Sequence, residues 1–348
     1  MPEPVLAYPS DLLPVQEAVA SALTRVEKLF DASLRSDLPP VQRLVQHIES
    51  YRGKMLRPAL VVLCGMAAPI DPGGSGGSAD QPREVSDAHI RIAAVCEMIH
   101  MATLVHDDVL DEADIRRKGA TVNRLRGNEA AVILGDYLFS SAYHLCATLD
   151  SLVAARLIGQ TGMTLCSGEL LQLHHRENLS IDQPTYFEVV RRKTGSLISV
   201  ACRLGAWQSG ATETVANRFG DFGMALGVAF QIQDDLLDLT GNQKIVGKPL
   251  RKDLELGKLT LPVIHHLESA SGTERARTLE LLEATSGLDT GAVERLVAAL
   301  ERTRSLDFAR QKARDLVGQA KSLLAPLTET PAKRLLLIMA DQVVDRAN

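Results

Sequence analysis

Apolar residues recur at the spacing of an α-helix along nearly the whole chain, and this pattern restricts the possible folds more than any other feature. The alternation that is typical of half-buried strands is nearly absent. With 348 residues, 45% of them hydrophobic, the chain can build a large core. We therefore predict an all-α fold, a single-domain helical bundle over residues 1–348. Its helical stretches are 14–31, 40–51, 55–68, 87–112, 127–149, 152–175, 184–208, 214–239, 259–269, 276–284, 291–303, 305–325 and 329–346.

One segment interrupts this pattern clearly. Residues 71–82 read DPGGSGGSADQP and offer almost nothing that could pack in a core. We predict a flexible Gly/Ser-rich loop there.

Charge, apolar runs and cysteine content restrict the expected partners and the expected cellular location. The formal net charge of -5 gives no basic excess for a nucleic-acid backbone, so nucleic acid is not an expected partner. No apolar run reaches about 18 residues, the length that spans a membrane, and the N-terminal residues do not resemble a signal peptide. We expect a cytoplasmic protein with no transmembrane segment and with buried, reduced thiols. Its cysteines are Cys64, Cys96, Cys146, Cys166 and Cys202.

Two of the apolar helical stretches run into the same acidic motif, DDxxD, at residues 107–111 and 234–238. Positions i and i+4 stack on one face of a helix, while position i+1 lies about 100° away. The first and last aspartates of each motif therefore form an edge with two oxygen donors. The candidate metal ligands are Asp107, Asp108, Asp111, Asp234, Asp235 and Asp238.

A single DDxxD motif is often only a solvated acidic helix face or an N-cap. These two motifs, however, follow about two turns of apolar residues, toward the C-terminal end of a helix, where the helix dipole opposes negative charge. So many carboxylates repel one another unless cations neutralise them. Oxygen donors without His or Cys suit Mg²⁺, water and diphosphate oxygens better than zinc, and the spacing lacks the central Gly of a calcium loop.

Basic side chains occur in short motifs of their own. Each charge taken alone is most often a solvated surface group. Several, however, lie beside an acidic motif or in a Gly/Pro turn, where a cation can bind phosphate. Together they predict two diphosphate sites, one bridged by Mg²⁺ and one held by cations. These side chains are Lys54, Arg57, Arg116, Arg117, Lys193, Lys248 and Lys258.

From Gly53 to Pro262 the motifs GKxxRP, DDxxD, RR, KT, FQxxDD and KPxxxDxxxGKxTLP follow in the order of the trans-isoprenyl diphosphate (polyprenyl) synthase family, which the chain resembles. The resemblance implies an all-helical fold of the isoprenoid synthase type, built around a central cavity and usually homodimeric. The chain departs from the family's GGKRxRP motif at Arg52 and Met55, and Lys118 stands where Gly is usual after the Arg pair.

The resemblance also assigns roles to residues. Asp107, Asp111 and Asp234 correspond to ligands of Mg²⁺, with three ions implied per active site, and Asp108, Asp235 and Asp238 support them. The positions that hold the allylic diphosphate are Arg116, Lys193, Thr194, Gln231, Lys248 and Lys258. Those that hold isopentenyl diphosphate are Lys54, Arg57, His100 and Arg117. His100 lies two helical turns before Asp107, although a lone His in an apolar helix is more often a core residue.

The implied reaction is the Mg²⁺-dependent condensation of an allylic diphosphate with isopentenyl diphosphate, with transient membrane contact for release of the product. In this family a bulky aromatic residue five positions before the first Asp limits the product to about 15 or 20 carbons, one helical turn being roughly one isoprene unit long. That position is Ala102, followed by Thr103. We predict a product of about 30 to 50 carbons.

Three alternatives remain open. Met98 could close the channel, which would make the product geranylgeranyl diphosphate, of about 20 carbons. A class I terpene cyclase would replace the second DDxxD motif and would not need the cations for isopentenyl diphosphate. A non-catalytic partner subunit would typically lose the Asp motifs.

Overall fold

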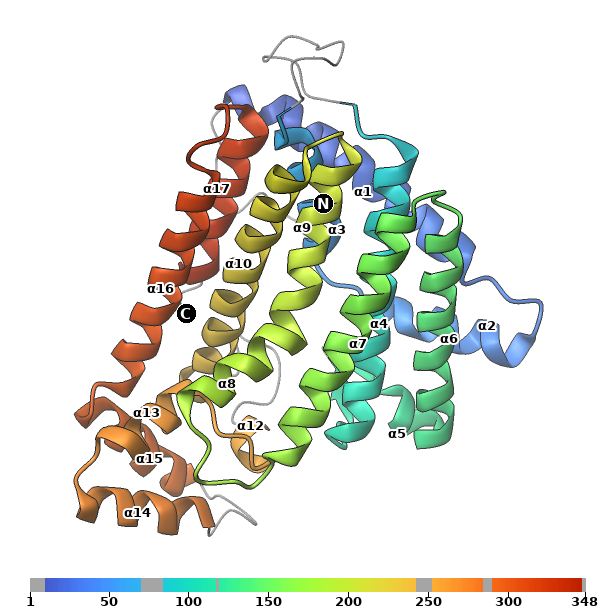
Figure 1. Ribbon diagram of the computed structural model, residues 1–348. Coiled ribbons are helices and arrows are strands. Elements are labelled where there is room, and N and C mark those ends of the chain that lie inside the picture. Colours follow the sequence, from blue (N-terminus) through green and yellow to red (C-terminus); the bar gives the residue numbers. More distant parts are fainter. Residues whose placement is uncertain (1–9, 70–83, 117–118, 242–251, 284–289, 346–348) are drawn as a thin grey trace. The chain divides into compact units, whose positions relative to one another are not determined.

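The computed structural model (Figure 1) describes residues 10–69, 84–116, 119–241, 252–283 and 290–345. The predicted loop at residues 71–82 lies outside them. The described residues are almost entirely helical, which confirms the all-α prediction. Their regular elements are η1 (Ser10–Leu12), α1 (Leu13–Ser33), α2 (Pro39–Ile48), η2 (Glu49–Tyr51), α3 (Leu56–Ala67), α4 (Asp87–Leu110), β1 (Ile115–Arg116), β2 (Gly119–Ala120), α5 (Val122–Arg126), α6 (Asn128–Ala147), α7 (Leu152–His174), α8 (Gln183–Val190), η3 (Arg191–Gly195), α9 (Ser196–Gln208), α10 (Glu213–Thr240), α12 (Lys252–Glu255), α13 (Leu261–Ser269), α14 (Gly272–Glu283), α15 (Thr290–Arg302), α16 (Ser305–Leu324) and α17 (Pro331–Val344).

The helices form two compact units. Unit 1 comprises Met1–Thr161, Leu197–Gly223 and Lys321–Met339, and unit 2 comprises Gly162–Ser196, Met224–Ala320 and Ala340–Asn348. By these bounds, the helices α7, α9, α10, α16 and α17 each have residues in both units. The expectation that residues 1–348 form a single domain stays a prediction.

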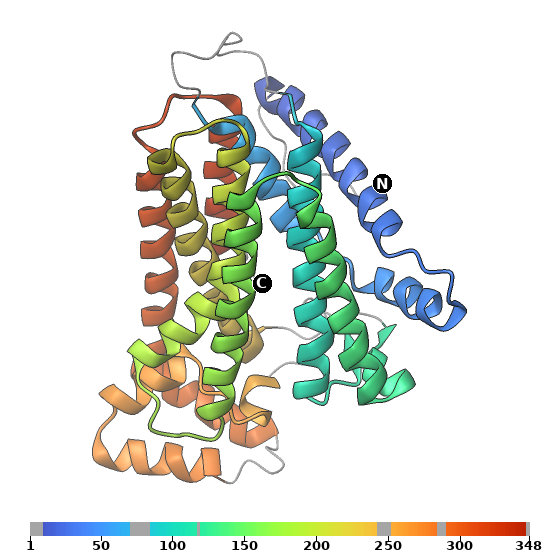
Figure 2. The ribbon, with the colours of Figure 1, turned by 45° about the vertical axis from the view of Figure 1, so that its right-hand side comes forward.

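Helix α4 is the central element of unit 1. It packs along α6 in both views of the ribbon (Figures 1 and 2) and also contacts α1 and α3. The side chains of Val95, Met98, Ile99 and Ala102 are all fully buried. At the start of the helix, the hydroxyl of Ser86 accepts a hydrogen bond from the backbone N–H of His89, as a helix N-cap does. A helix covered on several sides holds the acidic motif at its C-terminal end in place.

A glycine allows α3 and α9 to approach closely within unit 1. A Cβ atom at Gly205 would overlap the carbonyl oxygen of Val61 and lie 3.0 Å from its Cα atom. His89 on α4 also contacts α9, with its Nε2 3.2 Å from the carbonyl oxygen of Gly205. Gly205 is therefore required for backbone packing rather than for a turn.

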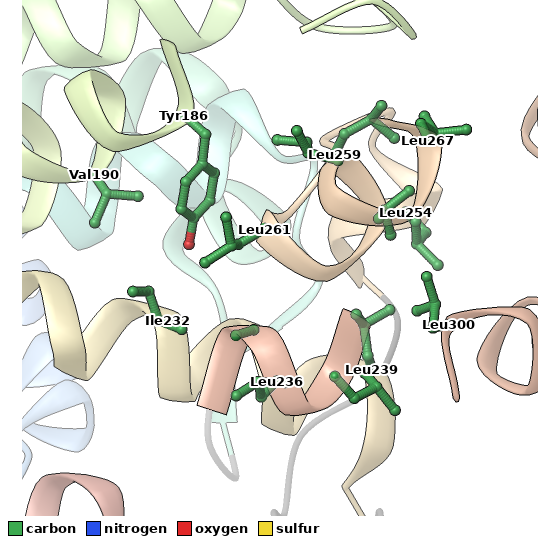
Figure 3. Close-up of a cluster of buried hydrophobic side chains, with 14 of the residues drawn as sticks. Tyr186, Val190, Ile232, Leu236, Leu239, Leu254, Leu259, Leu261, Leu267 and Leu300 are labelled. Carbon is green, nitrogen blue, oxygen red and sulfur yellow. The ribbon is translucent and has the colours of Figure 1, made fainter. Parts of the chain in front are cut away.

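The core of unit 2 surrounds the second half of α10 (Figure 3). Ile232, Leu236 and Leu239 on α10 belong to one buried cluster with Tyr186 on α8 and Leu254 on α12. This apolar packing holds in place the segment of α10 that carries the second acidic motif.

The predicted helix over residues 184–208 is a chain of three pieces. α8 passes into the π-helical turn η3, and η3 passes into α9. A π-helical turn places one extra residue in a helix and is frequent at functional sites. The predicted diphosphate-binding residues Lys193 and Thr194 both lie within this turn.

Helix α4 is the one helix in the described part of the chain that is long and apolar enough to cross a membrane, by length and composition alone. Arg91 and Glu97 interrupt its apolar sequence. Of its most apolar window, 72% is buried inside the protein. A helix buried to this extent is typical of the core of a folded protein.

Candidate active site

The first acidic motif lies at the C-terminal end of α4. Asp107 and Asp108 lie in its last turn, and Asp111 is the C-cap residue, with its backbone N–H donating to the carbonyl oxygen of Asp107 over 2.8 Å. Asp107 and Asp111 are partly exposed, whereas Asp108 is buried. The helix thus presents an edge of two carboxylates and turns the middle aspartate inward, as the i, i+4 spacing predicts.

Asp108 is held by a guanidinium group from the β1–β2 hairpin. The Nη2 and Nε atoms of Arg116 lie 2.6 and 2.8 Å from Oδ1 of Asp108. Burial raises the pKa of Asp108, while Arg116 and then the hydroxyl of Tyr51 oppose this shift. Burial alone would lower the pKa of Arg116, but its hydrogen bond to Asp108 and the nearby charges of Asp108 and Asp107 together outweigh that effect, and the pKa is raised. These two contacts anchor Arg116 beside the motif.

Of the residues predicted to hold isopentenyl diphosphate, Lys54 and Arg57 lie around the start of α3, and His100 lies within α4. Lys54 is exposed, whereas Arg57 on α3 and His100 on α4 are partly buried. Burial lowers the pKa of Arg57, and the charge of Glu97, itself 3% exposed on α4, opposes this shift. Met55, at a position where the chain departs from the family motif, has φ 52° and is the N-cap of α3. The departure thus falls on a left-handed backbone conformation that non-glycine residues seldom adopt.

The second acidic motif lies near the C-terminal end of α10. Asp234 is partly exposed, whereas Asp235 and Asp238 are buried. The oxygens of Asp238 accept hydrogen bonds of 3.3 Å from the backbone N–H groups of Lys252 and Asp253, which begin α12. Asp238 therefore acts as a cap that ties α12 to α10.

Asp235 is the centre of a buried hydrogen-bond network. Tyr186 donates to its Oδ2 over 2.6 Å, and the Nε2 of Gln231 donates to its Oδ1 over 2.8 Å. Thr194 donates in turn to the Oε1 of Gln231, also over 2.8 Å. Burial and then the nearby charge of Asp253 raise the pKa of Asp235 well above its ordinary range, against the effect of the two donors. The network links the π-helical turn η3 to the acidic motif.

The side chain of Lys193 is held by α7. Its Nζ lies 2.5 Å from Oε2 of Glu169 and 2.9 Å from Oε1 of Gln172. The helix and the π-helical turn are close together because residue 168 is glycine: a Cβ atom there would lie 2.6 Å from the Cβ of Arg192. An ammonium group with two such acceptors is fixed in one position.

Two predicted residues, Arg117 and Lys248, lie outside the described residues. Lys258 is 9% exposed, in the turn between α12 and α13. No three Asp, Glu, His or Cys side chains among the described residues are placed to hold a metal ion by themselves. The metal and diphosphate roles of the predicted residues stay predictions.

Several residues that contact the predicted site residues could not be predicted from the sequence. Glu97 did leave a signal, because it is a charge within an apolar helix. Tyr51 and Tyr186 left none, since a tyrosine in a periodic apolar stretch is indistinguishable from a core residue. Glu169 and Gln172 resemble ordinary polar residues of a surface helix until their partner Lys193 is known.

Comparison with known proteins agrees with the motifs. The family model described as polyprenyl synthetase matches residues 39–300. The nonaprenyl diphosphate synthase of Mycobacterium tuberculosis is 36% identical over 332 residues, which cover 94% of this chain and 93% of that protein. The crystal structure of a decaprenyl diphosphate synthase from Rhodobacter capsulatus is 33% identical, with a TM-score of 0.85 and coverage of 95% of this chain and 98% of that one. A polyprenyl synthase from Caulobacter crescentus CB15, crystallised with calcium and isoprenyl diphosphate, is 28% identical, with a TM-score of 0.86 and coverage of 97% and 98%. The chain therefore belongs to the polyprenyl synthetase family and is a trans-prenyltransferase with the all-α isoprenoid synthase fold.

Proposed function

We propose that the chain is a polyprenyl diphosphate synthase that lengthens an allylic diphosphate with isopentenyl diphosphate units. The observation that carries this is the repeated arrangement of the two acidic motifs. In each, the first aspartate stays partly exposed while the following one is buried and held by a cation or by hydrogen-bond donors. Two acidic helices of this kind suit a substrate that carries a diphosphate bridged by metal ions.

We propose Mg²⁺ as the metal, with three ions per active site. The residues fit it, because Asp107, Asp111 and Asp234 offer only hard oxygen donors and each remains partly exposed. Since no three such side chains converge among the described residues, the remaining ligands would be water and diphosphate oxygens. That shared coordination is the preference of Mg²⁺, which keeps several waters and binds through one or two carboxylates. When bound, the metal stabilises the negative charge of the leaving diphosphate.

The protein's own side chains supply the rest of the chemistry. Lys193, Lys258 and Arg116 bind the allylic diphosphate and stabilise the charge that builds on it as the allylic C–O bond breaks. Backbone and side-chain oxygens of Lys193, Thr194 and Gln231 stabilise the resulting carbocation. Lys54, Arg57 and His100 hold isopentenyl diphosphate, whose double bond attacks the cation to form the new C–C bond. The proton lost from the adjacent carbon passes to the released diphosphate.

Incorporation of isopentenyl diphosphate by the purified chain alone tests this function. With Mg²⁺ and allylic primers of about 10, 15 or 20 carbons, we expect elongated polyprenyl diphosphates and no cyclic hydrocarbon. A cyclic product would identify a terpene cyclase. Incorporation only after a second protein is added would identify a partner subunit instead.

The two proposed diphosphate sites should respond differently to loss of a lysine. We expect Lys54→Ala to raise the KM for isopentenyl diphosphate more than the KM for the allylic primer, and Lys193→Ala to do the reverse, because each removes a cation from a different site. Steady-state kinetics with each substrate varied in turn measures both. Lys28→Ala, which removes an exposed lysine of α1, is the matched control and should leave both KM values unchanged. Equal effects of Lys54→Ala and Lys193→Ala on the two KM values would contradict the partition.

We propose that the product has about 30 to 50 carbons, and that residue 102 helps to set this length. Ala102 lies on α4 a little more than one turn before Asp107, and a larger side chain there would fill space that a growing chain could use. We expect Ala102→Tyr to shorten the product to about 15 to 20 carbons and to spare the first condensation. Chromatography of the dephosphorylated products makes the measurement.

This prediction needs a control for stability, because Ala102 is fully buried and a larger side chain there could destabilise the fold. Thermal unfolding of Ala102→Tyr and of the smaller change Ala102→Val separates lost stability from shortened product. If Ala102→Tyr is folded and makes the wild-type product, the proposed role of residue 102 is wrong.

We further propose that the protein is a cytoplasmic homodimer with transient membrane contact during release of its apolar product. The support for association and for membrane contact is that α6 exposes Val132, Ile133 and Tyr143, while α7 exposes Met163 and Leu170. Removing such side chains from water favours association by about 25 cal/mol per Å² of apolar surface. Sedimentation velocity of the full chain tests the dimer.

A further inference from the structure

The hydroxyl of Tyr186 is directed at the middle aspartate of the second acidic motif. Tyr186 reaches from α8 toward α10, with its oxygen at the end nearer α10 (Figure 3), and that oxygen lies 2.6 Å from Oδ2 of Asp235. Tyr186 is 5% exposed and Asp235 is 4% exposed. A buried carboxyl group needs hydrogen-bond partners for its oxygens, and this phenol supplies one of them in a short hydrogen bond.

The second oxygen of Asp235 is engaged as well, so the carboxylate cannot rotate. The Nε2 of Gln231 donates to Oδ1, and the Oε1 of Gln231 accepts from Thr194. Thr194 thereby fixes which end of the Gln231 amide faces Asp235. The carboxylate is held between two elements, α8 and its own helix α10.

The middle aspartate of the first acidic motif is also buried, but it is held differently. Nη2 of Arg116 lies 2.6 Å from Oδ1 of Asp108, while Oδ2 of Asp108 has no hydrogen-bond partner among the described residues. Among the described residues, a buried phenol therefore anchors the middle aspartate at the second motif, where both carboxyl oxygens are engaged.

We propose that Tyr186 is a positioning residue for the metal-binding edge of the second motif. Anchoring the middle aspartate on the core side of a helix fixes the rotation of that helix about its axis. The first aspartate, about 100° away, then presents its oxygens in one direction. The inference rests on the proposed function, because it assumes that the acidic edges bind Mg²⁺ with a diphosphate.

Removal of one hydroxyl tests this inference. Tyr186→Phe keeps the ring in the apolar cluster and deletes only the donor to Asp235. We expect the dissociation constant for Mg²⁺, measured by titration calorimetry in the presence of inorganic diphosphate, to rise about tenfold or more, because loss of an outer partner of a metal ligand typically weakens metal binding by about 10- to 100-fold. The Mg²⁺ concentration at half-maximal prenyl transfer should rise in parallel.

Two control experiments distinguish a positioning role of Tyr186 from a general contribution to stability. Tyr137→Phe, which deletes a hydroxyl that lies 3.4 Å from the carbonyl oxygen of Leu34, should leave Mg²⁺ binding unchanged. In an Asp235→Asn background, Tyr186→Phe should cause little further loss, because its target is already altered.

An unchanged Mg²⁺ dissociation constant in Tyr186→Phe overturns the inference, whether or not the unfolding temperature falls. Full additivity of Tyr186→Phe and Asp235→Asn overturns it as well, and so does weaker Mg²⁺ binding in Tyr137→Phe equal to that of Tyr186→Phe. If wild-type protein transfers no prenyl group but Tyr186→Phe still weakens Mg²⁺ binding, the proposed function fails and the positioning role stands.

Discussion

Asp107→Ala and Asp234→Ala should each lower the rate of prenyl transfer by about a thousandfold or more while the protein stays folded. Each change removes a partly exposed carboxylate proposed as a metal ligand. A metal ion contributes several kcal/mol to the stabilisation of transition-state charge, and each 1.36 kcal/mol corresponds to a factor of ten in rate. The folded state should survive, because removal of one charge from an acidic cluster relieves repulsion. Single-turnover rates at saturating Mg²⁺ measure the effect.

A matched control for these variants is available on α6. Asp136 has a side chain 61% exposed and lies 3.5 Å from Nε2 of His106. Asp136→Ala removes the same charge from the surface and should leave the rate within about twofold, since exposed ion pairs contribute little. A near-wild-type rate for Asp107→Ala or Asp234→Ala would show that the metal assignment is wrong.

Gly205→Ala should lower the free energy of unfolding by about 3 kcal/mol or more, the upper end of what overpacking costs. The added methyl group would overlap the carbonyl oxygen of Val61 on α3. That oxygen belongs to a helix backbone, which cannot move aside as the end of a flexible side chain could. Urea unfolding followed by circular dichroism gives the free energy.

Gly159→Ala on α7 is the control for this effect. A Cβ atom there would meet nothing within 4 Å. Because alanine favours a helix over glycine by about 1 kcal/mol, this variant should be slightly more stable than the wild type. If both variants unfolded at the same urea concentration, the close approach of α3 and α9 would not limit stability.

The sequence predicted the long helices well, because their apolar periodicity continues over many turns. The expected stretch 214–239 is α10 (Glu213–Thr240), and 305–325 is α16 (Ser305–Leu324). The short β1–β2 hairpin was missed, since strands of two residues leave no alternation to detect. The π-helical turn η3 was missed as well, because one extra residue does not disturb the apolar pattern of a single helix noticeably.

The acidic edges were predictable for a geometric reason. The spacing of Asp107 and Asp111 alone places them on one face of a helix and turns Asp108 elsewhere. The partner that Asp108 meets there is Arg116, which reaches it through the tertiary fold. Local sequence determines which way such a side chain points, whereas its partners depend on how distant segments pack.

The cysteines offer a practical consequence of the packing. Cys64, Cys96, Cys146 and Cys202 are buried, and Cys166 alone of the five is exposed. It lies on α7 three residues after Met163 and four before Leu170, on the exposed side of that helix. A maleimide fluorophore would therefore attach to the native chain at this one thiol, without mutagenesis. Its emission would report directly on whether α7 is covered when two chains meet.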